Sequence, residues 1–209
     1  MALVLTVLVI FALLVGNEVY WRKAKTHNEF ARKFIHLTVG TLVAFWPFFL
    51  SWQQIRLLSI AFIVVVAISK YAHIFRAIHS VQRPTYGELW FAAAVGLTTL
   101  ITNNKWIYMT ALLQMSLADG LAAIIGTRYG RANSYKIFGQ HKSIAGTATF
   151  AVISLLSLMI FMYGSGTYIA PLIIAPIAIG ATILENVGVY GLDNLLVPLF
   201  VASVLGLVS

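Results

Sequence analysis

Residues 106–126 read WIYMTALLQMSLADGLAAIIG, an almost wholly apolar run with one charged side chain, Asp119. A transmembrane helix needs about 20 mostly apolar residues, so this run is long enough to cross a bilayer. An unpaired carboxylate inside such a helix is costly, and a metal ion, another cation or a proton must compensate it. The run therefore predicts a transmembrane helix whose carboxylate has a function.

The whole chain shares this apolar character. Of its 209 residues, 60% are hydrophobic and 10% are charged, and the mean hydropathy is +0.90. Soluble domains are about 45–50% apolar and about 25% charged, so the composition excludes a soluble globular enzyme and a disordered chain. The absence of cysteine excludes a disulfide framework and thiolate chemistry. No basic soluble module is present, which excludes nucleic acid as a partner.

Apolar runs of membrane-spanning length recur along the sequence and predict an all-α, polytopic integral membrane protein. We expect eight transmembrane helices in a single domain, residues 1–209, at residues 2–20, 34–51, 55–71, 88–103, 106–126, 144–163, 168–186 and 191–208. The first of them lacks a basic segment before its apolar run, so we expect an anchor rather than a cleaved signal peptide.

The charges indicate the orientation. The 14 basic residues outnumber the 6 acidic ones, giving a net charge of +8, and basic residues concentrate in cytoplasmic loops. With the N-terminus outside, eight crossings leave only Arg56 and Lys105 outside and place both termini outside. Acids that merely end helices would lie at both faces, whereas here all six lie toward the inside: Glu18, Glu29, Glu88, Asp119, Glu185 and Asp193. This clustering predicts a site at the cytoplasmic face.

The first motif with chemical meaning opens the second predicted helix. Its charged and polar positions, with a glycine, share one helical face because of their spacing: Glu29, Arg32, Lys33, His36 and Gly40. Such a face suits a phosphate or a polar headgroup. The alternative is a capping box formed by Thr26 and Glu29 together with ordinary cytoplasmic cations, which leaves His36 unexplained.

The second motif, Arg83-Pro84-Thr85-Tyr86-Gly87-Glu88, leads into the fourth predicted helix. Pro84 and Gly87 favour a turn, and Glu88 then lies in a first helical turn, where the helix dipole favours an acid. A turn followed by a helix start explains most of this motif without a ligand.

The third motif is the strongest and extends over residues 118–147. Small residues recur at Ala118, Ala122 and Gly126, a spacing that lets another backbone approach closely. A basic loop follows, and Ser143 or Thr147 can cap the next helix, whose N-terminus would attract an anion. Together these features suit a metal-bound polyphosphate. Helix packing beside an ordinary basic loop is the alternative, and it leaves Asp119 unexplained.

The fourth motif brackets a glycine-containing turn with two acids, Glu185 and Asp193, each followed by an asparagine. These oxygens suit Mg²⁺, which takes one or two carboxylates plus substrate phosphates. The alternative is that Asp193 and Asn194 cap the last helix.

In this order, the motifs resemble those of the CTP-dependent lipid-alcohol kinases: dolichol kinase, phytol kinase and the CTP-using diacylglycerol kinase, which are relatives of phosphatidate cytidylyltransferase. In that family, the nucleotide motif has the pattern Asp-x2-Ala-x3-Gly-x3-Gly, followed by Lys-Ser/Thr-x-Glu-Gly. It is matched here by Asp119, Ala122, Gly126, Gly130, Lys142, Ser143, Gly146 and Thr147. The first, second and fourth motifs resemble the family's Arg-Lys-x-x-His helix, Arg…Gly turn and Asp-Asn-x-x-x-Pro end, so the resemblance covers residues 29–200.

The resemblance implies an enzyme that transfers the γ-phosphoryl group of CTP, with Mg²⁺, to a long-chain isoprenoid alcohol such as phytol, a polyprenol or dolichol. It implies catalytic roles for Asp119, Lys142, Glu29 and His36, with Glu29 or His36 as the base. The expected metal ligands are Asp119, Asp193 and Glu185. The expected nucleotide contacts are Gly126, Arg128, Gly130, Arg131, Lys142, Ser143, Gly146, Thr147, Arg32, Lys33 and Arg83. Membrane lipids surround such a chain, and a homodimer is compatible with it.

One position departs from the family pattern, because Ala145 stands where the Lys-Ser-x-Glu-Gly motif has its glutamate. Glu88 or Glu185 could take over the role of that glutamate, or the chain could be a non-catalytic membrane subunit. A CTP:phosphatidate cytidylyltransferase is the nearest alternative, although the longer acid-rich C-terminal signature of those enzymes is missing. A transporter using Asp119 as a coupling carboxylate would place its acids nearer the midplane and show an inverted repeat, and neither is present.

Overall fold

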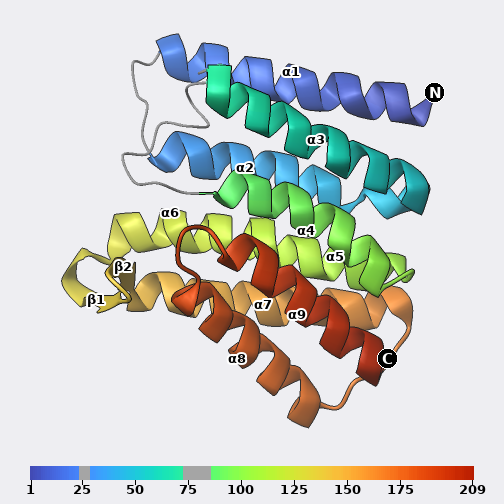
Figure 1. The fold of residues 1–209 in the computed structure, drawn as a ribbon. Coiled ribbons are helices and arrows are strands. Elements are labelled where there is room, and N and C mark those ends of the chain that lie inside the picture. The colour runs from blue at the N-terminus through green and yellow to red at the C-terminus, as the bar shows by residue number, and fades with distance from the viewer. Residues whose placement is uncertain (24–28, 73–85) are drawn as a thin grey trace.

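A computed structural model describes residues 1–23, 29–72 and 86–209, and this part of the chain is an all-α membrane protein with one small β-hairpin (Figure 1). Its elements in chain order are α1 (Ala2–Lys23), α2 (Glu29–Ala44), the 3₁₀ turn η1 (Trp46–Phe48), α3 (Trp52–Ala72), α4 (Gly87–Ile101), α5 (Lys105–Leu113), the π-helical η2 (Gln114–Ala118), α6 (Asp119–Tyr129), the 3₁₀ turn η3 (Arg131–Asn133), β1 (Ser134–Ile137), β2 (Gln140–Ser143), α7 (Ile144–Ser165), α8 (Pro171–Val187) and α9 (Asp193–Val208).

Each apolar run of the sequence coincides with a helix. Within the described residues, three helices are long and apolar enough to cross a membrane: Ala2–Tyr20, Lys105–Tyr129 and Ile144–Ser165. The second is a continuous rod in which α5, η2 and α6 follow one another without a break. The other apolar helices are shorter: Lys33–Phe48, Trp52–Ile68, Gly87–Ile101, Pro171–Val187 and Asp193–Val208.

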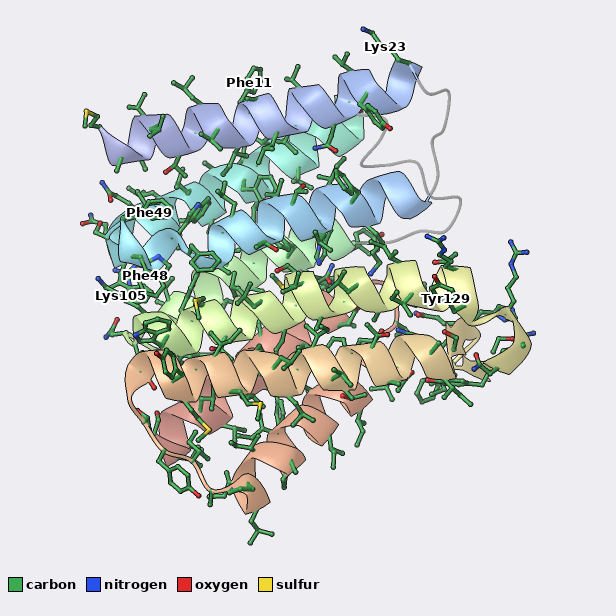
Figure 2. The ribbon with its side chains drawn as sticks, turned by 180° about the vertical axis from the view of Figure 1, so that it is seen from behind. Phe11, Lys23, Phe48, Phe49, Lys105 and Tyr129 are labelled. Carbon is green, nitrogen blue, oxygen red and sulfur yellow. The ribbon has the colours of Figure 1, made fainter. Side chains whose placement is uncertain are left out.

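The rod of residues 105–129 forms the centre of the bundle. In its most apolar window, 67% of the residues are buried, against 17% for α1. Tyr108 and Leu112 have no exposed surface. By contrast, α1 lies at the outer side of the bundle and Phe11 points away from it (Figure 2). The central position of the rod means that neighbouring helices surround the carboxylate it carries.

Both termini lie at one end of the bundle and the hairpin lies at the other (Figure 1). Lys23 and Tyr129 mark the hairpin end, whereas Lys105, Phe48 and Phe49 mark the opposite end (Figure 2). The loop that joins α8 to α9 also lies at the hairpin end. This is the arrangement that successive antiparallel crossings produce.

The rod contains a π-helical segment that the sequence analysis did not predict. Residues 114–118 have this geometry directly before Asp119. A π turn widens the helix and disturbs the regular hydrogen bonding, and such segments occur often at functional sites. Gln114 in this segment is fully buried, and its Oε1 accepts a hydrogen bond of 2.9 Å from Ser154 Oγ. The segment is therefore packed tightly against α7.

The polar stretch 127–143 is not simply a loop, because it folds into an antiparallel hairpin with Ile137 opposite Gln140. The two-residue turn Phe138-Gly139 has φ values of 47° and 77°. Positive φ at both positions is the type I′ arrangement that fits the twist of a hairpin. The hairpin leads straight into α7, where Ser143 Oγ accepts a 3.1 Å hydrogen bond from the amide of Gly146. Ser143 is thus the N-cap of α7, which confirms one of the two predicted candidates, Ser143 and Thr147.

The alternative interpretation of the fourth motif, in which Asp193 and Asn194 cap the last helix, is wrong. The residue before α9 is Leu192, and no side chain caps this helix. Asn194 instead donates from Nδ2 to the backbone oxygen of Gly87 at 3.0 Å. The side chain therefore ties the start of α9 to the start of α4, a long-range contact that local sequence cannot reveal.

Candidate active site

A cavity of about 950 Å³ lies at the hairpin end of the bundle. Its walls come from α6, the hairpin, the first turn of α7, the end of α8 and the loop leading into α9, with Lys33 reaching in from α2. The structure brings eleven of the predicted site residues into this wall: Lys33, Asp119, Gly126, Gly130, Arg131, Lys142, Ser143, Gly146, Thr147, Glu185 and Asp193. Cations and carboxylates from six elements, α2, α6, η3, β2, α8 and α9, thus meet in one space.

The compensating partner of Asp119 is a cation. Lys33 Nζ forms an ion pair with Asp119 Oδ2, and their side chains are 12% and 7% exposed. The imidazole of His36 lies nearby, with Nε2 3.7 Å from the same oxygen. Lys33 and His36 are three residues apart on α2, so the predicted shared face of this helix points at α6. The Lys33 side chain reaches both Asp119 and the cavity.

His36 also contacts the π-helical segment. Its Nε2 lies 3.0 Å from the backbone oxygen of Met115, and a carbonyl oxygen can only accept, so Nε2 is the donor. The ring also packs edge-on against Phe91, with the ring centroids 5.1 Å apart. A nitrogen that already carries a proton cannot accept one. This geometry places His36 beside Asp119 with Nε2 as a donor, so that the predicted role of His36 as a base stays a prediction that only Nδ1 could fulfil.

Lys142 and Glu185 form a second ion pair across the cavity. Lys142 Nζ lies 2.5 Å from Glu185 Oε1, and it also donates to the backbone oxygen of Glu185 at 3.0 Å. Burial lowers the pKa of Lys142, but Glu185, Asp119 and Asp193 together raise it above its ordinary value. Lys142 is therefore charged at neutral pH, and an anion that enters the cavity would share it with Glu185.

Asp193 lines the same cavity, and in the described part of the chain it has no ion-pair partner within 4 Å. No three described His, Cys, Asp or Glu side chains lie close enough together to enclose a metal ion. Mg²⁺, however, typically uses one or two carboxylates and takes its remaining ligands from substrate phosphates and water. The donor set of Asp119 and Asp193 fits that use.

The hairpin is fastened to the C-terminal end of α8. Tyr135 donates from its hydroxyl to Asn186 Oδ1 at 2.6 Å and also contacts the hydroxyl of Thr147. Gln140 Nε2 donates to the backbone oxygen of Gly188 at 3.2 Å. These contacts, with the Lys142 pair, hold the hairpin over the cavity. The roles of Tyr135 and Gln140 were not predicted from the sequence, because the hairpin that positions them was not predicted.

Close packing of α6 on α7 depends on glycines beside the cavity. A Cβ atom on Gly126 would lie 2.8 Å from Ser143 Oγ, and one on Gly146 would lie 3.0 Å from the backbone oxygen of Ala122. The predicted stripe of small residues therefore does allow close backbone approach.

Two predicted site residues that the structure describes, Arg128 and His36, are not among the residues that line this cavity. Arg128 is exposed, and its guanidinium lies 5.5 Å from the centre of the Tyr129 ring. The side chains of Glu29 and Arg32 and all of Arg83 lie outside the described residues. Ala145 follows the α7 cap and is not among the lining residues.

Two curated proteins are similar to this chain over most of its length. A phytol kinase of Synechocystis sp. is 32% identical over 196 residues, which cover 90% of this chain and 83% of that protein. A probable chloroplastic phytol kinase 2 of Glycine max is 29% identical over 190 residues, covering 82% of this chain and 63% of that protein. No protein-family profile matches the chain, and no solved structure matches it.

Proposed function

This chain belongs to the family of the phytol kinases, and from that premise we propose that it is a membrane kinase that transfers the γ-phosphoryl group of CTP to a phytol-type isoprenoid alcohol. The observation that carries the proposal is the cavity in which Asp119, Lys142 and Asp193 converge at one end of an apolar bundle. A kinase of this kind must bring a water-soluble polyanion to a hydroxyl on a membrane-bound chain. A polar cavity at the end of membrane helices meets that need.

We propose that the eight apolar runs cross the membrane with both termini outside, which puts the cavity at the cytoplasmic face. The antiparallel succession of the described helices supports this topology. So does the position of Lys105 at the end opposite the hairpin (Figure 2). CTP would then reach the cavity from the cytoplasm, and the alcohol would reach it from the bilayer.

Phosphoryl transfer depends mainly on positioning and charge neutralisation. In this proposal, Lys142 and Arg131 bind the phosphates, and Lys33 and His36 fix the orientation of the Asp119 carboxylate. Asp119 and Asp193 would hold Mg²⁺, which would neutralise charge on the phosphates. The alcohol oxygen bonds to the γ-phosphorus, the bond from that phosphorus to the β–γ bridging oxygen breaks, and the hydroxyl proton passes to solvent water. The products are CDP and the alkyl phosphate.

The proposal is tested by phosphate transfer with purified protein in detergent. CTP or ATP labelled in the γ-phosphate would be offered with Mg²⁺ and, in turn, phytol, geranylgeraniol, a polyprenol and diacylglycerol. We expect label in the isoprenoid alcohols from CTP. Lys142→Gln should transfer far less, whereas Lys105→Gln, an exposed lysine at the other end of the bundle, should match the unsubstituted protein. Absence of labelled lipid with well-folded protein would overturn the proposal.

A further inference from the structure

Two aromatic residues beside the cavity have a strained backbone. Among the described residues, Phe138 and Tyr190 are the only non-glycine positions with positive φ, at 47° and 54°. Each is followed by a glycine whose φ also lies in the left-handed region, 77° at Gly139 and 83° at Gly191. A bulky residue at positive φ is an outlier, and the first position of a type I′ turn normally has Asn, Asp or Gly. Turn formation therefore does not explain why both positions have an aromatic side chain.

The two turns face the same space. Phe138 in the hairpin turn and Tyr190 in the loop between α8 and α9 both line the cavity that contains Arg131 and Lys142. The hydrogen bond from Gln140 to Gly188 joins the two segments close to each turn. The backbone oxygen of Tyr190 also accepts a hydrogen bond of 3.1 Å from the amide of Tyr86, at the start of α4. Both turns are thus held in place by contacts outside themselves.

The rings are also exposed, which core packing does not explain. Phe138 is 75% exposed and Tyr190 is 60% exposed. Both lie at the polar end of the molecule, beside cations and carboxylates rather than along the lipid-facing sides of the helices. An exposed ring at the rim of a phosphate-binding cavity is suited to stack on a nucleobase, because every base has a flat apolar face.

We propose that Phe138 and Tyr190 form the nucleobase-binding part of this site, stacking on the pyrimidine ring of a nucleotide whose phosphates lie on Lys142 and Arg131. This inference rests on the proposed function for the presence of a nucleotide, and it adds where and how the base is held. Stacking by itself tolerates any base, so these rings supply affinity, and the choice of base falls to hydrogen bonds elsewhere.

The two turns allow a substitution that removes the ring and keeps the backbone. Asn followed by Gly is a preferred type I′ pair, so Phe138→Asn should preserve or raise the thermal unfolding midpoint while it removes the stacking surface. Tyr190→Asn is the equivalent change in the other turn. Phe138→Tyr and Tyr190→Phe retain a ring and should retain function. Tyr168→Asn is the matched control, since Tyr168 is 77% exposed and lies between α7 and α8 at the far end of the bundle.

The test is equilibrium binding of CTP and of inorganic tripolyphosphate to the full-length protein in nanodiscs. We expect each Asn variant to bind CTP about 10-fold more weakly, with tripolyphosphate affinity unchanged and both affinities unchanged in the control. Equal CTP affinity in the Asn variants and the unsubstituted protein would overturn the inference while leaving the kinase proposal intact. Failure of the unsubstituted protein to bind CTP would overturn the proposed function itself.

A membrane-inserted ring is the competing use of an exposed phenylalanine, and a second variant tests for it. Phe138→Trp places a fluorophore in the turn, and its emission is obtained by subtracting that of the unsubstituted protein. We expect CTP to change this emission and brominated acyl chains to leave it unchanged. Quenching by the brominated lipid, with no response to CTP, would contradict the nucleobase site and indicate a membrane contact instead.

Discussion

Lys33 and Asp119 form an ion pair between α2 and α6, 86 positions apart in the sequence, inside a bundle where each side chain is largely buried. Removal of one partner from a buried pair leaves an uncompensated charge and costs about 3–5 kcal/mol, whereas replacement of both by apolar residues is often tolerated. We therefore expect Lys33→Met to lower stability strongly and the double variant Lys33→Met/Asp119→Leu to recover most of the loss. Thermal unfolding in detergent measures both. A double variant no more stable than Lys33→Met would contradict the pairing.

His36 acts through its neighbours in this account, so its replacement should lower kcat without changing the pH profile. Its contact with the Met115 oxygen is a donated hydrogen bond, which a glutamine amide can replace and a leucine cannot. We expect His36→Gln to retain at least about 10-fold more activity than His36→Leu, a loss in line with one buried hydrogen bond. Rates measured from pH 5.5 to 9 test this. Disappearance of an acidic limb in His36→Gln would identify the residue as a base instead.

Lys142 should remain a cation over the whole working range of the enzyme. Its pKa is raised above the ordinary value by the surrounding carboxylates. Because the pKa is higher in the folded state, the charge of Lys142 contributes its full stabilisation at any pH below the unfolded-state pKa of about 10.4. This stabilisation is lost only as the pH rises through the higher folded-state pKa. We expect the KM for CTP to show no increase attributable to Lys142 between pH 7 and 9. Removal of the charge in Lys142→Gln should raise that KM by about 10- to 100-fold, the worth of a charged hydrogen bond.

A KM that rises steadily between pH 7 and 9 in the unsubstituted protein, but stays flat in Lys142→Gln, would contradict the raised pKa. Lys105→Gln is the control for both measurements, because Lys105 is exposed at the opposite end of the bundle.

Gly146→Ala should destabilise the protein by about 1–3 kcal/mol, the usual cost of overpacking. Its new Cβ would meet the backbone oxygen of Ala122 at 3.0 Å, and backbone cannot move aside as a flexible side chain can. Gly16 and Gly206 are matched helical controls because a Cβ at either would meet nothing within 4 Å. Alanine there should be neutral or stabilising by up to about 1 kcal/mol. Equal unfolding midpoints for Gly146→Ala and Gly206→Ala would show that α6 and α7 are not closely packed.

The helices were predictable because apolar length alone decides them. Each predicted span overlaps an observed helix or, for residues 106–126, the continuous rod of residues 105–129, although the span 34–51 runs past the end of α2 at Ala44 into η1. The shared face of Lys33 and His36 was also predictable, since helical spacing is local. The helix that this face contacts was not predictable, because nothing in the sequence shows which helix lies opposite α2. The residues alone therefore left a metal ion, another cation and a proton open as the partner of Asp119, and the family resemblance added Mg²⁺ as the expected ligand.

The hairpin and its contacts were missed for a different reason. Residues 134–143 are polar and short, and a turn that begins with Phe138 lacks the usual Asn-Gly or Asp-Gly signal of a hairpin. The available signal was an aromatic-glycine pair recurring as Phe138-Gly139 and Tyr190-Gly191. Only the backbone angles distinguish these pairs from other aromatic-glycine pairs in the chain, such as Tyr129-Gly130.

Transfer of the γ-phosphoryl group is tested by comparing CTP labelled in the α-phosphate with CTP labelled in the γ-phosphate, using purified protein, Mg²⁺ and phytol. We expect label in the lipid from the γ-phosphate alone. We expect that label to be lost in Asp119→Asn, assayed below the lowered unfolding midpoint that the loss of the Lys33 partner produces. Label in lipid from the α-phosphate, with phosphatidate as the acceptor, would contradict the kinase and indicate cytidylyl transfer.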